Sequence, residues 1–73
     1  MTAEEWVRRF ATELGTEAPD EGELDEILKL ASIAAHASER TAAPIACWIG
    51  GRTGRSAAAL REVAKTVNPG GED

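Results

Sequence analysis

The feature that most constrains the fold is a predicted helix over residues 23–40 with an unusually wide apolar face. At 100° per residue, its leucines, isoleucines and alanines cover roughly 220° of the helix circumference. A helix on the surface of a domain needs a narrower stripe, so we expect this helix to be central, with neighbours on two sides. The remaining polar strip is narrow and contains Asp25, Lys29, Ser32, His36, Glu39 and Arg40.

A second amphipathic helix is predicted over residues 2–14. Thr2 and Glu5 have the spacing of a capping box, in which each side chain bonds the backbone amide of the other residue. Gly15 follows as the left-handed residue that ends a helix. The apolar residues at helical spacing include two of the three aromatics, so we expect this helix to supply much of the core. They are Trp6, Val7, Phe10 and Leu14.

Two shorter helices are predicted in the second half of the chain, over residues 44–51 and 56–67. Pro44 suits the first turn of a helix, where its missing amide is no loss, and Thr41 precedes it as the expected cap. The glycines at 50 and 51 are expected to end the first of these helices. Ser56 is the expected cap of the second, which carries an amphipathic stripe.

These segments predict an all-α fold, a compact four-helix bundle with helices at about 2–14, 23–40, 44–51 and 56–67. No segment alternates with a period of two, so no strand is expected. The 73 residues form one domain, residues 1–73, of which residues 68–73 are expected to be a flexible tail. One cysteine and one histidine are too few for an internal disulfide or a structural zinc site. Packing alone, or packing against a partner, must therefore stabilise the fold.

The net charge of −5 is unevenly distributed along the chain. Residues 1–39 carry ten acidic and three basic residues, a net charge of −7, and residues 40–73 carry five basic and three acidic residues, a net charge of +2. The acidic half argues against binding to nucleic acid or to an anionic membrane. A lone cysteine fits a reducing cytosol, and neither a signal peptide nor a membrane-spanning apolar run is present. We therefore expect a cytoplasmic protein.

His36, Arg40, Trp48 and Arg52 are the candidate binding residues. On the predicted central helix, His36 and Arg40 lie one turn apart on the same face, and with Arg52 they would hold an anion. The alternative is a polar face that only contacts solvent. Trp48 either closes one end of the core or forms an exposed apolar patch with neighbouring isoleucines, a surface that would bind a partner.

No set of residues indicates catalysis, a metal or a cofactor. Cys47 has neither a second cysteine nor a nearby histidine in the sequence, so a small buried thiol is expected. The run from Gly50 to Ser56 is superficially similar to a phosphate-binding loop, but it lacks the glycine–lysine spacing and a preceding strand. A turn between two helices, with Ser56 as the cap of the second, explains it better. We therefore predict that the protein is not an enzyme.

Nearly the whole chain resembles a small actinobacterial helical domain. The resemblance lies in Trp6-Val7-x-x-Phe10-Ala11-x-x-Leu14-Gly15, in Leu28 and Ala31, in Ala35-His36-x-x-Glu39-Arg40-x-Ala42-Ala43-Pro44-Ile45, and in Gly50. That domain occurs alone or as a C-terminal extension of molybdenum-cofactor guanylyltransferase. The resemblance implies an all-helical accessory domain linked to molybdenum-cofactor biosynthesis or molybdoenzyme maturation. It carries no assigned activity, and Trp48 is bulkier than the aliphatic residue usual in that position.

Three functions are consistent with these features. The first is a non-catalytic accessory domain that binds a protein partner or a second copy of itself. The second is a small-molecule module that binds an anionic nucleotide or pterin. The third is a helix-turn-helix DNA-binding domain, which the acidic charge opposes. We expect the first.

Overall fold

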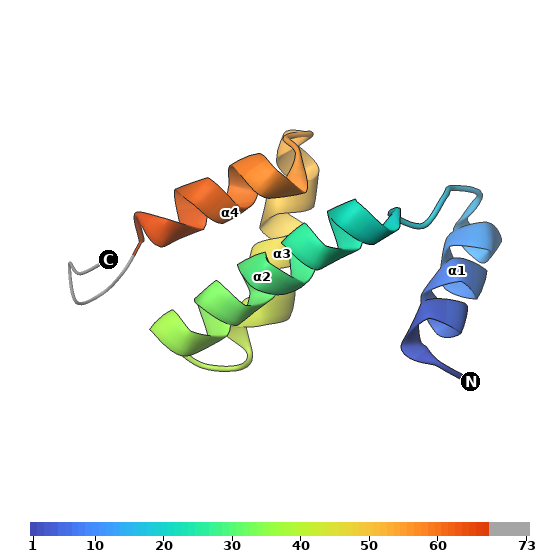
Figure 1. The fold of residues 1–73 in the computed structure, drawn as a ribbon, viewed down its shortest axis with the longest axis horizontal. Helices are drawn as coiled ribbons and strands as arrows, with labels where there is room; N and C mark the ends of the chain where they lie inside the picture. The colour runs from blue at the N-terminus through green and yellow to red at the C-terminus, as the bar shows by residue number, and fades with distance from the viewer. Residues whose placement is uncertain (68–73) are drawn as a thin grey trace.

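The structure, a computed structural model, describes residues 1–67 and contains four helices and no strand in that range (Figure 1). The helices are α1 (Ala3–Leu14), α2 (Glu21–Ala37), α3 (Ala42–Thr53) and α4 (Ala57–Lys65). The predicted all-α class and the four helices are confirmed. The tail predicted at residues 68–73 lies outside the described residues. Within residues 1–67, no helix has both the length and the apolar character needed to cross a membrane.

The ends of α1 follow the predicted pattern. The Thr2 amide donates a hydrogen bond of 2.9 Å to Glu5 Oε1, and the Glu5 amide donates one of 3.1 Å to Thr2 Oγ1. Gly15 ends the helix in the left-handed conformation, with φ of 77°. The Thr16 amide then bonds the carbonyl of Ala11 at 2.9 Å, so the C-terminus of α1 is closed by backbone contacts.

α2 begins and ends earlier than predicted. Asp20 caps it by accepting a hydrogen bond of 2.7 Å from the Glu23 amide, so the helix starts at Glu21. At its other end, Ser38 leaves the helical conformation, with φ of −141° and ψ of −103°. The predicted end at Arg40 is therefore wrong. The last apolar residue of the stripe is Ala37, polar residues follow it, and the chain turns there to bring α3 back against α2.

α3 is longer than predicted at both ends, spanning Ala42–Thr53 in place of residues 44–51. Two turn-forming hydrogen bonds before it, accepted by the carbonyls of residues 39 and 40, start the helix ahead of Pro44. Thr41 occupies the N-cap position but makes no side-chain cap hydrogen bond. Gly50 does not end the helix, because it is a buried packing position. Gly54 ends it instead, with φ of 75°.

α4 is capped as predicted, since the Ala59 amide donates a hydrogen bond of 3.1 Å to Ser56 Oγ. It ends at Lys65, two residues before the predicted end at residue 67. Only Gly54, Arg55 and Ser56 separate it from α3. This connection is a turn between helices, with a left-handed glycine and a serine cap.

α2 is the central helix, as its apolar face predicted, because α3 and α4 both pack along it (Figure 1). The most buried apolar side chains are few: Leu30 of α2, Ala57 of α4 and Ala11 of α1. Gly50 of α3 is also buried. The small alanine side chains of α2 allow α3 and α4 to pack closely against it, but the resulting core buries little apolar area.

α1 does not supply the core volume that was predicted for it. It lies beyond the N-terminal end of α2 and makes no extensive contact with another helix (Figure 1). Trp6 is 55% exposed, Phe10 51% and Leu14 65%. The stripe was identified correctly, but no partner covers it within the described chain. The two aromatic rings stack on each other instead, with centroids 5.0 Å apart.

Candidate functional site

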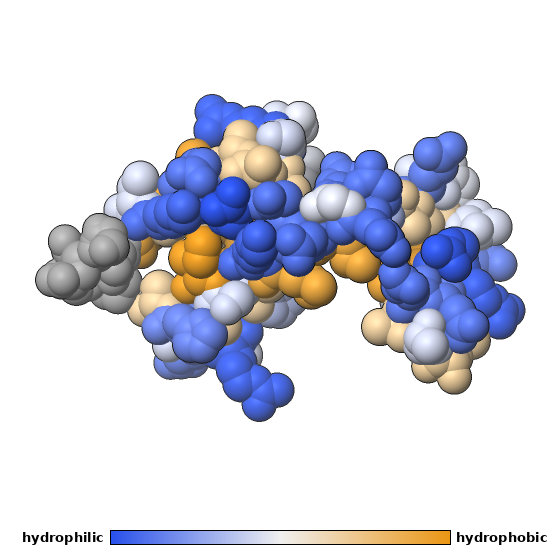
Figure 2. All heavy atoms as spheres, in the orientation of Figure 1, coloured by the Kyte–Doolittle hydropathy of each residue, from blue (hydrophilic) through white to orange (hydrophobic). Residues whose placement is uncertain are grey.

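An open apolar groove lies between α2, α3 and α4. Its volume is about 890 Å³. Aliphatic side chains from all three helices line it, among them Leu30, Ile33, Ile45, Ile49, Leu60 and Val63. On the face drawn in Figure 2, hydrophobic residues reach the surface along the middle of the molecule, between hydrophilic outer surfaces. The groove is a core that lacks a cover on one side.

The depth of the groove depends on how closely α4 approaches α3. A Cβ placed on Gly50 would lie 2.6 Å from Leu60 Cδ1, far below ordinary van der Waals contact. Glycine at this position therefore lets Leu60 lie against the backbone of α3. The larger aliphatic residues on either side of this contact are left to line the groove.

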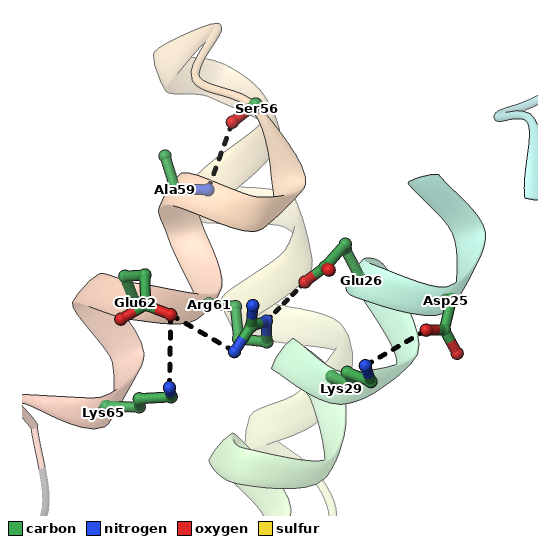
Figure 3. A network of polar contacts seen from close by, with 8 residues as sticks. All are labelled: Asp25, Glu26, Lys29, Ser56, Ala59, Arg61, Glu62 and Lys65. Atoms are coloured by element: carbon green, nitrogen blue, oxygen red, sulfur yellow. Dashed lines mark hydrogen bonds and ion pairs between the residues drawn. The ribbon is translucent and has the colours of Figure 1, made fainter. Parts of the chain in front are cut away.

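An ion-pair network holds α4 against α2 behind the groove (Figure 3). Arg61 of α4 donates a hydrogen bond to Glu26 of α2 and lies 3.2 Å from Glu62. Lys65 lies 3.2 Å from the same Glu62 carboxylate. The bond to Glu26 raises the pKa of the Arg61 guanidinium, so the pair stays charged. The Arg61 side chain is only 23% exposed. Among the described residues, the pair of Arg61 with Glu26 is the one ion pair that joins two helices, and its access to solvent is limited.

The edge of the groove near the α3–α4 turn is basic. Arg55 lines the groove, and the guanidinium of Arg52 lies 4.9 Å from the centre of the Trp48 ring, in a cation–π contact. Neither arginine has a carboxylate within 4 Å among the described residues. This edge therefore presents uncompensated positive charge next to an apolar surface.

Trp48 is 63% exposed, so it does not close the end of the core. Ile45 and Ile49, on the same helix, are also more than half exposed. Of the two alternatives for Trp48, the geometry favours the exposed apolar patch. Trp48 itself lies beside the groove rather than in its lining.

His36, Arg40 and Arg52 do not form one site. His36 Nδ1 lies 2.8 Å from the Ser32 carbonyl and 3.1 Å from its hydroxyl, so the ring is bonded to its own helix. Arg40 lies outside α2, and the predicted one-turn spacing on a single helix is therefore lost. Arg40 precedes the N-terminus of α3, whereas Arg52 lies in its last turn, about 15 Å along the axis from Ala42. The anion site predicted from these residues is not assembled.

Cys47 is partly buried on α3, and desolvation raises the pKa of its thiol. Among residues 1–67, no three histidine, cysteine or acidic side chains gather as metal ligands would. The residues of the site are thus aliphatic side chains with arginines at one edge. Sequence periodicity identified the stripes on α3 and α4 but not the groove, because the uncovered side depends on where α1 lies.

The fold and the groove define a small all-α domain with an open apolar surface. The chain belongs to the DUF6457 family, a domain of unknown function, whose model matches residues 1–70. No curated protein matches the chain, and no solved structure does.

Proposed function

We propose that this protein is a non-catalytic accessory domain that binds an amphipathic helix in the groove between α2, α3 and α4. The observation that carries the proposal is the groove itself, an apolar hollow of about 890 Å³ open to solvent. Exposed contiguous apolar surfaces of this kind are a property of protein interaction sites. A groove between helices is the usual receptor for the apolar face of another helix.

The charges at the edge of the groove add a preference for the bound helix. Arg52 and Arg55 lie at that edge without a carboxylate partner among the described residues. A helix with acidic residues beside its apolar stripe would pair with them, and such pairing contributes orientation and association rate more than affinity.

The biological setting follows from the resemblance of the central run around His36 to a domain attached to molybdenum-cofactor guanylyltransferase. We place the protein in the cytoplasm of an actinobacterium, as an accessory factor in molybdenum-cofactor assembly or molybdoenzyme maturation. The lone Cys47, with no disulfide partner in the chain, supports a reducing compartment. Because the His36 ring is bonded to its own helix and Arg52 lies in the last turn of α3, away from the turn that carries Arg40, no observation favours a pterin or nucleotide site.

The test compares two variants of the full chain that add the same charge to opposite faces of α3. Ile49→Glu places a carboxylate in the groove, whereas Gly51→Glu places it where no atom lies within 4 Å of a new Cβ. Affinity capture from the native host, followed by binding assays with the purified guanylyltransferase, measures the effect. The proposal requires a protein that binds wild type and Gly51→Glu but not Ile49→Glu. Equal binding to all three chains would refute the groove as the binding surface.

A further inference from the structure

We infer that the groove is occupied by α1 of a second copy of this chain, in a dimer in which the two copies exchange α1 reciprocally. The inference rests on the proposed helix-binding function of the groove and names its occupant. Three observations carry it: the exposed stripe of α1, the restricted link between α1 and α2, and the charges beside both surfaces.

The first observation is that α1 is an amphipathic helix with an uncovered apolar face. Trp6, Phe10 and Leu14 lie within about 80° of one another around the helix and are all more than half exposed. Their spacing of i, i+4 and i+8 puts all three on one face of the helix, as the anchor residues of a helix in an apolar groove must be. The chain therefore contains both a helix that needs a groove and a groove that needs a helix.

The second observation is that α1 is held away from the groove of its own chain. Hydrogen bonds fix Thr16 to the end of α1 and Asp20 to the start of α2, which leaves three residues, 17–19, as the hinge. Pro19 fixes its own φ and holds the residue before it in an extended conformation. The groove starts at Leu30, about 14 Å along α2 from Glu21, and extends to residues beyond the end of α2. Docking into the groove of a second copy does not require α1 to fold back along α2 of its own chain.

The third observation is charge complementarity. At 100° per residue, Glu13 borders the α1 stripe beside Trp6, with Arg9 as the next charged residue beyond it, and Glu4 lies on the other side beyond Val7 and Ala11. Neither carboxylate has a basic partner within 4 Å among the described residues. The groove carries unpaired arginines at its edge, Arg52 and Arg55. Docking of α1 would bring these opposite charges together at a partly desolvated edge.

The area that reciprocal exchange would bury matches what a stable dimer needs. Aromatic side chains expose about 150–250 Å² when free, so half-exposed Trp6 and Phe10 still present about 200–250 Å² between them. With about 100 Å² from Leu14, one α1 stripe offers roughly 300 Å². Counting the groove surface as well, one docked helix buries about 550 Å², and two bury about 1,100 Å². A specific interface needs more than about 1,000 Å² in total, so two exchanged helices reach that size and one does not.

The experiment measures the mass of the full chain in solution by sedimentation velocity and light scattering. The expected result is a dimer of the 7.7 kDa chain. Phe10→Glu on the stripe and Ile49→Glu in the groove should each yield monomers, with unchanged helix content by circular dichroism because both residues are more than half exposed. Val63→Glu provides a second groove variant should Ile49→Glu fail to fold.

Matched controls place the same carboxylate on the opposite faces. Thr12→Glu lies opposite the stripe on α1, and Gly51→Glu lies opposite the groove on α3, so both should remain dimers. An equimolar mixture of Phe10→Glu and Ile49→Glu contains one intact helix and one intact groove. It should therefore associate more strongly than either variant alone.

A monomeric wild type overturns the inference, and so does a dimer that survives either Phe10→Glu or Ile49→Glu. Survival of Ile49→Glu would indicate pairing between the two α1 helices, and survival of Phe10→Glu would indicate pairing between grooves. These failures differ from failure of the proposed function. If another protein binds wild type but not Ile49→Glu while Phe10→Glu has no effect, the groove binds a helix that is not α1.

Discussion

The adjacent glycines of α3 provide a sharp test of the packing between α3 and α4. Both are helical, neither has a positive φ, and alanine is therefore compatible with the backbone at both positions. Alanine in place of glycine inside a helix raises stability by about 1 kcal/mol. Gly51→Ala should show this gain in full, because nothing lies within 4 Å of its new Cβ.

Gly50→Ala gains the same helix propensity but meets Leu60. Its Cβ would lie 2.6 Å from Leu60 Cδ1 and 3.4 Å from Leu60 Cγ, so the side chain must move by about 1 Å to restore ordinary carbon contact. Overpacking of this kind costs about 1–3 kcal/mol. We therefore expect Gly50→Ala to range from neutral to about 2 kcal/mol less stable than wild type.

The difference between the two variants isolates the steric effect, since the propensity gain is common to both. The free energies of unfolding of the two variants should differ by about 1–3 kcal/mol. In a domain of this size, each kcal/mol shifts the Tm by roughly 4–8 °C. Urea and thermal unfolding followed by circular dichroism at 222 nm measure it. In a Leu60→Ala background, the penalty at Gly50 should disappear. Equal stabilisation by Gly50→Ala and Gly51→Ala would refute the close approach of α3 and α4.

Three further predictions concern stability and reactivity. Leu30→Ala should lower the free energy of unfolding by about 2–3 kcal/mol, because it removes the most buried large side chain of α2. The loss is limited because the open groove beside Leu30 can partly relax, and an unchanged urea midpoint would contradict this packing. Ser56→Ala should lower it by about 1 kcal/mol through loss of the bond to the Ala59 amide, a loss that Ser56→Asp should largely avoid. The Cys47 thiol, whose pKa is raised by burial, should react with iodoacetamide more slowly than free cysteine at pH 8, and the difference should vanish in urea. A folded chain that reacts as fast as free cysteine would argue against that burial.

Local features of the helices could be predicted from the sequence because short-range contacts determine them. The capping box of Thr2 and Glu5, the left-handed Gly15 and the Ser56 cap depend on residues within four positions of one another. The wide apolar face of α2 also predicted its central place correctly, because a helix must cover such a face. In contrast, the start of α2 was misplaced because the local cap by Asp20 was missed, and the end of α3 was misplaced because tertiary packing at Gly50 outweighed local preference.

Gly50 illustrates why those errors arose. By sequence it indicates the end of a helix, because glycine is a poor helix former. In the structure it continues the helix, since a neighbour 10 residues later, Leu60, occupies the space that a side chain would need. Periodicity carries no information on which glycine faces a neighbouring helix. For the same reason, the one-turn spacing of His36 and Arg40 was lost when the chain turned at Ser38.

The sequence alone determined that this is an all-α chain of four helices, that Thr2 and Ser56 cap α1 and α4, and which face of each helix is apolar. These properties follow from local hydrogen bonding and helical spacing. Only the tertiary structure decided which apolar faces meet. It buries one face of α2 under α3 and α4, leaves the stripe of α1 exposed, and leaves an apolar groove open between α2, α3 and α4. The physical reason is that burial of apolar surface is non-directional. Each apolar stripe must be covered, but the stripe does not specify which helix, or which copy of the chain, covers it.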